Sequence, residues 1–226
     1  MNIEKPDFVD YIAKLSEVSG IKIDSFKALK EALAKRMERA GASAVIAEGT
    51  ESGGHIGENT TMCLVPQVVD AVSIPVIAAG GIADGRQLAA AFMLGAVGVQ
   101  VGTRFLVAKE CTIAQAYKDK VLKAKDIDSV VTGKRLGHPV RSIRNQFTRE
   151  YAKAEYDASS VSDEELEKMA SGVLRMAARE GDVKNGCVLT GQVASMVTRE
   201  QTAREIITEM FGEAEAVLNG ATKWVK

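Results

Sequence analysis

A glycine-rich segment with one histidine is the stretch of the sequence best suited to chemistry. EGTESGGHIG, residues 48–57, holds four glycines, two glutamates and His55. Glycines allow positive φ and a close approach of the backbone to another group. An imidazole in such a loop can donate a proton to a substrate or hydrogen-bond one of its oxygens. His55 is therefore the candidate catalytic residue, and a structural or surface histidine is the alternative.

Two further segments follow short apolar runs and are rich in small or polar residues. They are AAGGIADG, residues 78–85, and QVGTRF, residues 100–105. Glycine amides at the carboxyl ends of parallel strands can hold a phosphate, helped by the positive end of the following helix. The alternative is that these glycines only allow tight turns. The residues predicted to surround the phosphate are Ala79, Gly80, Gly81, Gly102 and Thr103.

The elements that must position these residues alternate along the chain. Short apolar runs predict strands at 44–47, 74–79 and 97–101. Segments with helical periodicity precede the first run and separate the runs, and the first of these helices is predicted at 25–42 with Ser25 as N-cap. This alternation is typical of βαβ units and of an α/β fold whose parallel sheet is covered on both faces. A weaker strand signal lies at residues 20–24.

Two polar residues stand at the ends of the predicted strands. Glu48 follows the first apolar run, and Gln100 lies near the end of the third. A polar side chain at the end of a buried strand is costly unless it faces a ligand or finds a partner. We expect both side chains to point into the site. A buried hydrogen bond to the backbone is the alternative.

The chain after Phe105 has a mostly helical pattern. His138 lies there in the basic segment KRLGHPVRSIRNQ, which suits contact with a phosphate-bearing substrate or carrier; a solvated loop is the alternative. Short strand-like stretches occur at 129–131 and 187–189. Helices are predicted at 112–125, 143–158, 162–180 and 198–218, the last with Thr198 as its N-cap.

Composition limits the classes of protein to which the chain can belong. Its 226 residues are 46% hydrophobic, which is enough for one domain with a core. A net charge of -1 gives no whole-molecule attraction to nucleic acid or to an anionic membrane. The three cysteines lack a metal-binding spacing, and no signal peptide or span of about 18 apolar residues is visible. We expect a cytoplasmic protein without a metal.

Several segments together resemble the nitronate monooxygenase (2-nitropropane dioxygenase) family of FMN enzymes. They are AVIAEGTESGGHIG, IPVIAAGGIADG, GAVGVQVGTRFLVAKE, GHPVRSIRNQFTREY and GCVLTGQVASMV. Within the family, the chain is most similar to the bacterial enoyl-acyl-carrier-protein reductase II branch. The resemblance implies a TIM-barrel flavoprotein that binds FMN, takes electrons from NADH or NADPH and reduces a small-molecule or acyl-carrier-bound 2-enoyl thioester in fatty acid synthesis. Oxidation of alkyl nitronates is the alternative activity, and a non-catalytic fragment is the alternative outside this class.

The resemblance also assigns roles to single residues. It implies that His55 is catalytic and that the FMN phosphate lies on the AAGGIA and VGTRF segments. Gln192 belongs to GQVAS, a stretch that lies over the flavin in the family. Gln100 is expected near the flavin ring or ribityl chain. The cofactor-binding residues expected outside the phosphate site are Glu48, Gly54, Gln100 and Gln192.

The chain departs from the family in the number of its strands. A complete barrel has eight βα units, whereas three clear units are visible here. We therefore expect a leader at 1–33 without a counterpart in the family. Residues 34–110 should form the last part of a flavin-binding barrel, and residues 111–226 a mostly helical region. An open edge of apolar parallel strands favours association, so we expect a homo-oligomer, and weak or absent turnover by a monomer.

Overall fold

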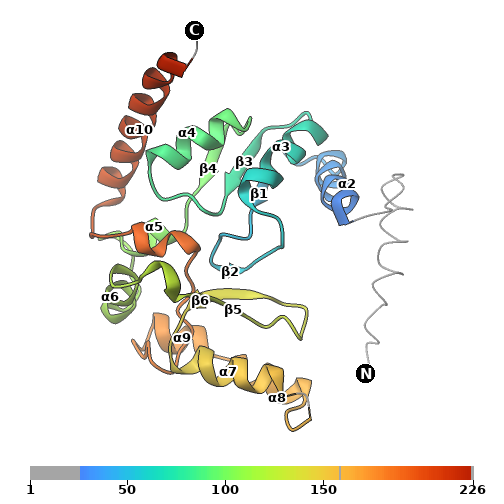
Figure 1. The fold of residues 1–226 in the computed structure, drawn as a ribbon, viewed down its shortest axis with the longest axis vertical. Helices are drawn as coiled ribbons and strands as arrows, with labels where there is room; N and C mark the ends of the chain where they lie inside the picture. The colour runs from blue at the N-terminus through green and yellow to red at the C-terminus, as the bar shows by residue number, and fades with distance from the viewer. Residues whose placement is uncertain (1–25, 158, 225–226) are drawn as a thin grey trace.

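Three parallel strands form the sheet on which the first half of the fold is built (Figure 1). The computed structural model describes residues 26–157 and 159–224. The predicted strands and their parallel pairing are confirmed, whereas the strand expected at 20–24 and the N-cap expected at Ser25 lie outside the described residues. The strands are β1 (Val45–Glu48), β3 (Val76–Ala79) and β4 (Gly98–Gln100), and their order is β1-β3-β4.

Four helices pack around this sheet and place its core on one face. α3 contacts β1 and β3, α4 contacts β4, and α10 packs along α4. The largest buried side chains of this cluster include Val65, Leu88 and Ile206. Among the described residues, no helix has the length and apolar character of a membrane span. The helices are α2 (Phe26–Arg39), α3 (Thr61–Ala71), α4 (Gly85–Met93) and α10 (Ala203–Gly220).

The opposite face of the sheet is less well covered. Ile46 pairs with Ile77 in register, on the face opposite to Ala47 and Ala78, which belong to the core. The Ile46 side chain is 52% exposed. The described residues contribute three parallel strands, whereas a complete barrel has eight, so apolar side chains on this face lack the enclosure of a barrel. The expectation that both faces of the sheet are covered is therefore corrected for the described residues. The expected homo-oligomer stays a prediction.

A second sheet lies beside the first and was only partly expected. It contains β2 (Gly54–His55), β6 (Val140–Ile143) and β5 (Ser129–Thr132), all antiparallel, in the order β2-β6-β5. β5 matches the predicted stretch at 129–131, whereas β2 and β6 were not predicted. The stretch at 187–189 makes a single bridge, from Leu189 to Ser142. The region after residue 111 therefore contains a small sheet besides its helices.

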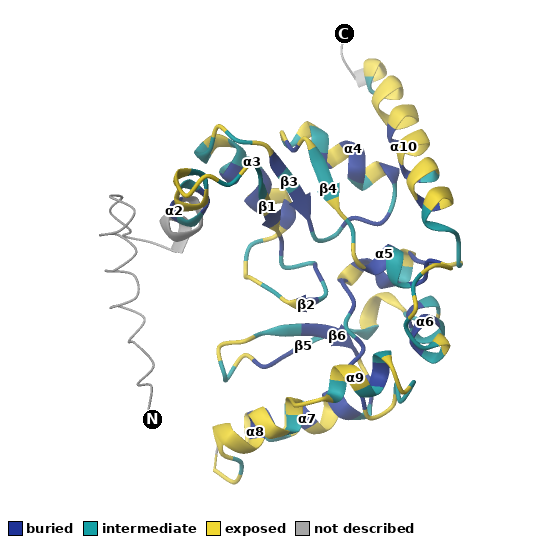
Figure 2. Cartoon of the chain, turned by 180° about the vertical axis from the view of Figure 1, so that it is seen from behind, coloured by how far each residue is buried: buried dark blue, intermediate teal, exposed yellow. Residues whose placement is uncertain are grey.

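Short helices cover this second sheet, and two predicted helix boundaries are corrected. Gly172 has a φ of 76°, and it separates α8 from α9 where one helix was expected over 162–180. The last helix begins after Thr202, whose side chain accepts the Glu205 amide in a capping box, and not at Thr198. Figure 2 shows exposed residues along the outer sides of α8 and α10. The remaining helices are α5 (Thr103–Leu106), α6 (Gln115–Leu122), α7 (Gln146–Tyr156), α8 (Asp163–Ala170) and α9 (Val173–Ala178).

Candidate functional site

A cavity of about 410 Å³ opens at the carboxyl ends of the three parallel strands. We call it the glycine cavity, because the glycines of two strand ends line it. The residues predicted to surround a phosphate all lie on its wall, as do Glu48 and Gln100. The parallel sheet brings them together because all three strands end at the same edge. The predicted residues on the wall are Glu48, Ala79, Gly80, Gly81, Gln100, Gly102 and Thr103.

Backbone conformation explains why glycines stand at the end of β3. Gly80 and Gly81 have φ angles of 88° and 71°, which L side chains rarely adopt. A Cβ on Gly80 would also lie 2.8 Å from the Gly49 carbonyl oxygen. The turn itself therefore requires glycine at both positions. Gly102 is different, because its φ is −98° and an added Cβ would meet no atom within 4 Å.

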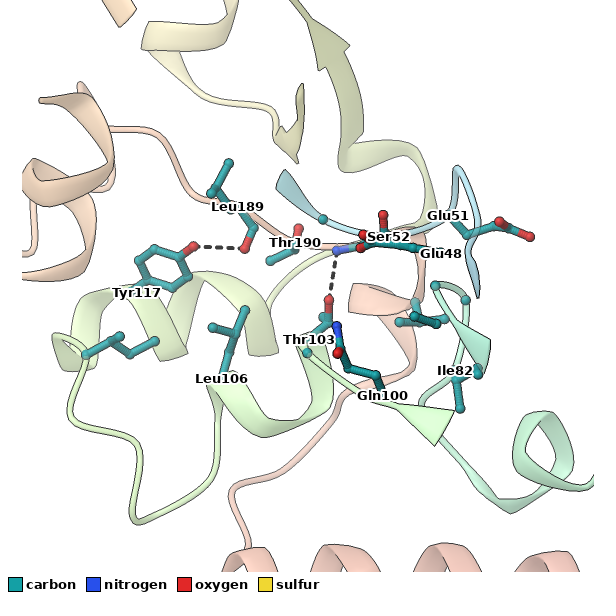
Figure 3. Close-up of a pocket in the computed structure, with 18 of the residues that line it drawn as sticks. Glu48, Glu51, Ser52, Ile82, Gln100, Thr103, Leu106, Tyr117, Leu189 and Thr190 are labelled. Atoms are coloured by element: carbon teal, nitrogen blue, oxygen red, sulfur yellow. Dashed lines mark hydrogen bonds between the residues drawn. The ribbon is translucent and has the colours of Figure 1, made fainter. Parts of the chain in front are cut away.

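Two hydrogen bonds join segments that are far apart in the sequence and shape this cavity. The Gly191 amide donates to Thr103 Oγ1 at 2.8 Å, and Tyr117 Oη donates to the Leu189 carbonyl at 2.8 Å (Figure 3). The Thr103 hydroxyl thus already accepts one hydrogen bond. Burial raises the pKa of Tyr117, so this phenol stays protonated as a donor.

Two buried hydroxyls on the wall of the glycine cavity have no hydrogen-bond partner among the described residues. They belong to Ser52 and Thr190, which are 8% and 1% exposed. An unpaired buried hydroxyl is costly, and a bound ligand is one way to satisfy it. Neither residue was singled out from the sequence. Ser52 lies within the glycine-rich segment, and Thr190 directly precedes the GQVAS stretch, so position in those motifs was the available signal.

Glu51 and Arg141 hold the glycine-rich segment in place. The Glu51 carboxylate accepts hydrogen bonds from the Thr61 amide at 2.9 and 3.0 Å and from Thr61 Oγ1 at 3.0 Å, at the first residue of α3. Arg141 is buried on β6, and its Nε donates to the Thr50 carbonyl at 3.1 Å. Burial lowers the pKa of this guanidinium, an effect that Glu51 opposes by charge attraction. The segment is therefore tied to α3 and to the second sheet.

His55 lies on a second cavity, of about 360 Å³, which we call the histidine cavity. His55 lines only this second cavity, whereas Leu174 and Leu189 line both cavities. The cause is β2, which pairs with β6 and carries the histidine toward the second sheet. His138 lines the same cavity, and its ring centroid lies 6.5 Å from that of His55.

The wall of the histidine cavity is mainly apolar. Its aliphatic and aromatic side chains come from the second sheet, α7, α9 and the segment before η2 (Gln192–Met196). Burial raises the pKa of the Cys187 thiol on this wall to about 11. The apolar side chains that line the cavity include Leu136, Val140, Phe147, Val173, Leu174 and Leu189.

Two predicted cofactor residues lie beside the glycine cavity and do not line it. Gly53 is on the wall in place of Gly54, which pairs with Arg141 in the second sheet. Gly191 and Val193 are on the wall in place of Gln192, whose side chain is exposed. The backbone amide of Gln192 donates to the Glu51 carbonyl at 2.8 Å. With the backbone held in this way, Gly191 and Val193 line the cavity and the Gln192 side chain does not.

Comparison with known proteins places this chain in a family. The sequence model described as nitronate monooxygenase matches residues 4–213. The match therefore extends into residues 1–33, which corrects the expectation that this leader has no counterpart in the family. A probable nitronate monooxygenase of Staphylococcus saprophyticus is 37% identical over 220 residues, which cover 92% of this chain and 60% of that protein.

Solved structures give a consistent result. FabK from Thermotoga maritima superposes with a TM-score of 0.82 and 46% identity, over 86% of this chain and 61% of that one. Nitroalkane oxidase from Streptomyces ansochromogenes superposes with a TM-score of 0.68 and 28% identity, over 92% of this chain and 70% of that one. The chain spans 50% to 60% of the length of the curated relatives that it matches.

Proposed function

Because the chain belongs to the nitronate monooxygenase family, whose members are flavin-dependent oxidoreductases, we propose that it binds FMN and passes electrons from NADH or NADPH to a 2-enoyl thioester. The thioester would be a small molecule or would be carried on an acyl carrier protein. Oxidation of an alkyl nitronate is the second candidate, and the names of curated relatives favour it.

The glycine cavity is the observation that carries the proposal of a flavin. Its volume of about 410 Å³ lies within the usual range of small-molecule sites. Gly102 leaves open space where any side chain would project, and the Ser52 and Thr190 hydroxyls lack partners among the described residues. The residues present therefore fit a ligand with a phosphate and several polar atoms. When bound, FMN would supply hydride transfer between the nicotinamide and the substrate.

The chain's own residues would hold and orient that group. Backbone amides at the ends of β3 and β4, from Gly80 to Gly81 and at Gly102 and Thr103, would bind the phosphate. Glu48 and Gln100 would contact the polar part of the ligand. Tyr117, which is 2% exposed, would help to exclude water from the cavity.

His55 would act from the histidine cavity on the substrate. Leu174 and Leu189 line both cavities, so a substrate in the second cavity would lie next to a ligand in the first. The imidazole can donate a hydrogen bond to a substrate oxygen or give up a proton. The apolar wall of the second cavity suits an acyl chain better than a small nitronate, and this favours the reductase.

Replacement of Gly102 by valine tests the flavin site. Gly102 has negative φ and free space at its Cβ, so the change should leave the fold intact while obstructing a phosphate. Loss of one or two charged hydrogen bonds should weaken FMN binding about 10- to 100-fold. Gly81→Val is a poorer test, because the φ of 71° makes any side chain strained there.

Gly98→Val is the matched control, because a Cβ at Gly98 also meets no atom within 4 Å and Gly98 does not line the glycine cavity. Flavin affinity is read by quenching of FMN fluorescence during titration. Equal affinities of the two variants and the wild type would overturn the site. A wild-type protein that neither retains nor binds FMN would instead support the non-catalytic fragment.

Substrate choice is tested on flavin-loaded protein. NADH and NADPH consumption is followed with 2-enoyl thioesters of increasing chain length, and oxygen uptake is followed with alkyl nitronates. We expect the rate of NADH or NADPH consumption to rise with the chain length of the thioester. Oxygen uptake with nitronates and no thioester reduction would replace the reductase by the second candidate.

A further inference from the structure

The second sheet holds the two histidines of the chain on one cavity. His55 belongs to β2 and pairs with Val140 of β6, and the Ile56 amide donates to the Pro139 carbonyl at 3.0 Å. The segment from residue 138 to 140 therefore runs beside β2. His55 and His138 are the only histidines among the 226 residues, and both are exposed on the wall of the histidine cavity.

The loop that carries His138 is anchored by a buried carboxylate. Glu155 of α7 is 7% exposed and accepts the Gly133 amide at 3.1 Å and the Arg135 amide at 2.9 Å. The His138 amide donates to the Gly133 carbonyl at 3.0 Å, which closes the loop. Arg135 also forms an ion pair with Asp163 at 2.8 Å. The position of His138 is thus set by several interactions of its loop.

The distance between the rings suits one shared hydrogen-bond acceptor. With a ring nitrogen about 1.1 Å from its centroid and a hydrogen bond of about 2.9 Å, two directly bonded imidazoles have centroids about 5 Å apart. Two imidazoles that donate to the same oxygen have centroids at most about 8 Å apart. The observed separation is 6.5 Å, with an interplanar angle of 80°. The pair is thus too far apart for a direct bond and close enough for one atom between the rings.

We propose that His55 and His138 together bind one oxygen of a carbonyl or carboxylate whose alkyl chain occupies the histidine cavity. This inference rests on the proposed function, because it names the part of the acyl substrate that the second cavity recognises. A neutral imidazole has one N–H donor, so two histidines can direct two donors at one oxygen. Bonds to a charged or polarised oxygen are the stronger kind. His138 would be a binding residue beside His55.

Decanoate is a suitable probe, since it combines a carboxylate with an alkyl chain and needs no turnover. The full 226-residue chain contains two histidines, so its Hε1 proton NMR spectrum contains two imidazole signals. His138→Phe keeps an aromatic ring, removes both nitrogens and assigns the signals. We expect decanoate to move both signals with one dissociation constant. Each methylene that enters the cavity should increase affinity about fourfold, so hexanoate should bind more weakly.

Variants and a neutral analogue complete the test. His138→Phe should weaken decanoate binding about tenfold or more, and His138→Gln, which restores an N–H donor, should recover part of that loss. Glu167→Gln removes a negative charge from the same wall and should not weaken binding. Decanol should bind through its chain and move the histidine signals less than decanoate does.

Three outcomes would overturn the inference. They are movement of one histidine signal or of neither, equal affinity of the wild type and His138→Phe, and equal shifts with decanol and decanoate. The readout is independent of flavin affinity and of turnover. If Gly102→Val bound FMN as tightly as the wild type while decanoate moved both histidine signals, only the proposed flavin site would be overturned. If the flavin bound as expected but decanoate did not move both histidine signals, only the proposed oxygen site between His55 and His138 would be overturned.

Discussion

Thr103→Val should destabilise the protein through one hydrogen bond. Thr103 is 7% exposed, and its Oγ1 accepts the Gly191 amide at 2.8 Å in a buried position. Valine has nearly the shape of threonine and cannot accept this bond, so the change leaves a buried N–H without its partner. That loss costs about 1–3 kcal/mol. For a chain of this length, it corresponds to a fall in Tm of about 2–12 °C.

Thr190→Val provides a matched comparison at a neighbouring position. Thr190 is 1% exposed, and its hydroxyl has no hydrogen-bond partner among the described residues. The same chemical change there removes an unpaired polar group, so the free energy of unfolding should stay the same or rise. Thr103→Ser should retain the bond and lose only the packing of one methyl group.

Urea unfolding followed by circular dichroism measures all three variants under identical conditions. The expected order of stability places Thr190→Val at or above the wild type and Thr103→Val clearly below it. Equal losses in the two valine variants would show that shape, and not the bond to Gly191, decides the effect. A wild-type-like Thr103→Val would refute the reasoning outright.

Two further predictions concern the core and the response to pH. Leu88→Ala should lower the free energy of unfolding by about 2–5 kcal/mol in urea titrations, because Leu88 is 1% exposed at the packing of α4 on the sheet and α10; a loss below about 1 kcal/mol would contradict this packing. Burial raises the pKa of Cys187 to about 11, so the unfolded state releases the thiol proton first and stability should fall as pH rises from about 9 to 11. Urea midpoints over that range should fall less steeply in Cys187→Ala than in the wild type, with Tyr117 titrating in both; parallel curves would contradict the assignment.

Local sequence pattern was sufficient for the parallel sheet and for the glycine cavity. The strands β1, β3 and β4 each come from a short run of consecutive apolar residues, the pattern of strands that belong to a parallel sheet. Parallel strands end at one edge, so the small and polar residues that follow them had to meet. The wall formed by Gly80, Gly102 and Gln100 follows from these two facts.

Pairing between distant segments could not be predicted from local pattern. β2 has only two residues, and its partner β6 lies more than 80 positions later in the chain. Two residues are too few to show a period, so nothing near His55 indicated that it would pair with β6 and face a second cavity. The cap of α10 is a different case, because Thr198 and Thr202 are each followed three residues later by Gln or Glu and the local capping-box pattern fits both.

The sequence alone therefore determined the family, the strand ends and the types of residue available for chemistry. Tertiary structure alone decided which of these residues share a cavity. It placed His55 on the histidine cavity, away from the glycine cavity, and it placed His138 beside His55. The physical reason is that the burial of a strand or helix selects apolar residues within that segment, so it leaves a pattern in the local sequence. A contact such as the hydrogen bond from the Gly191 amide to Thr103 forms only when distant segments meet, so it leaves no pattern in the local sequence.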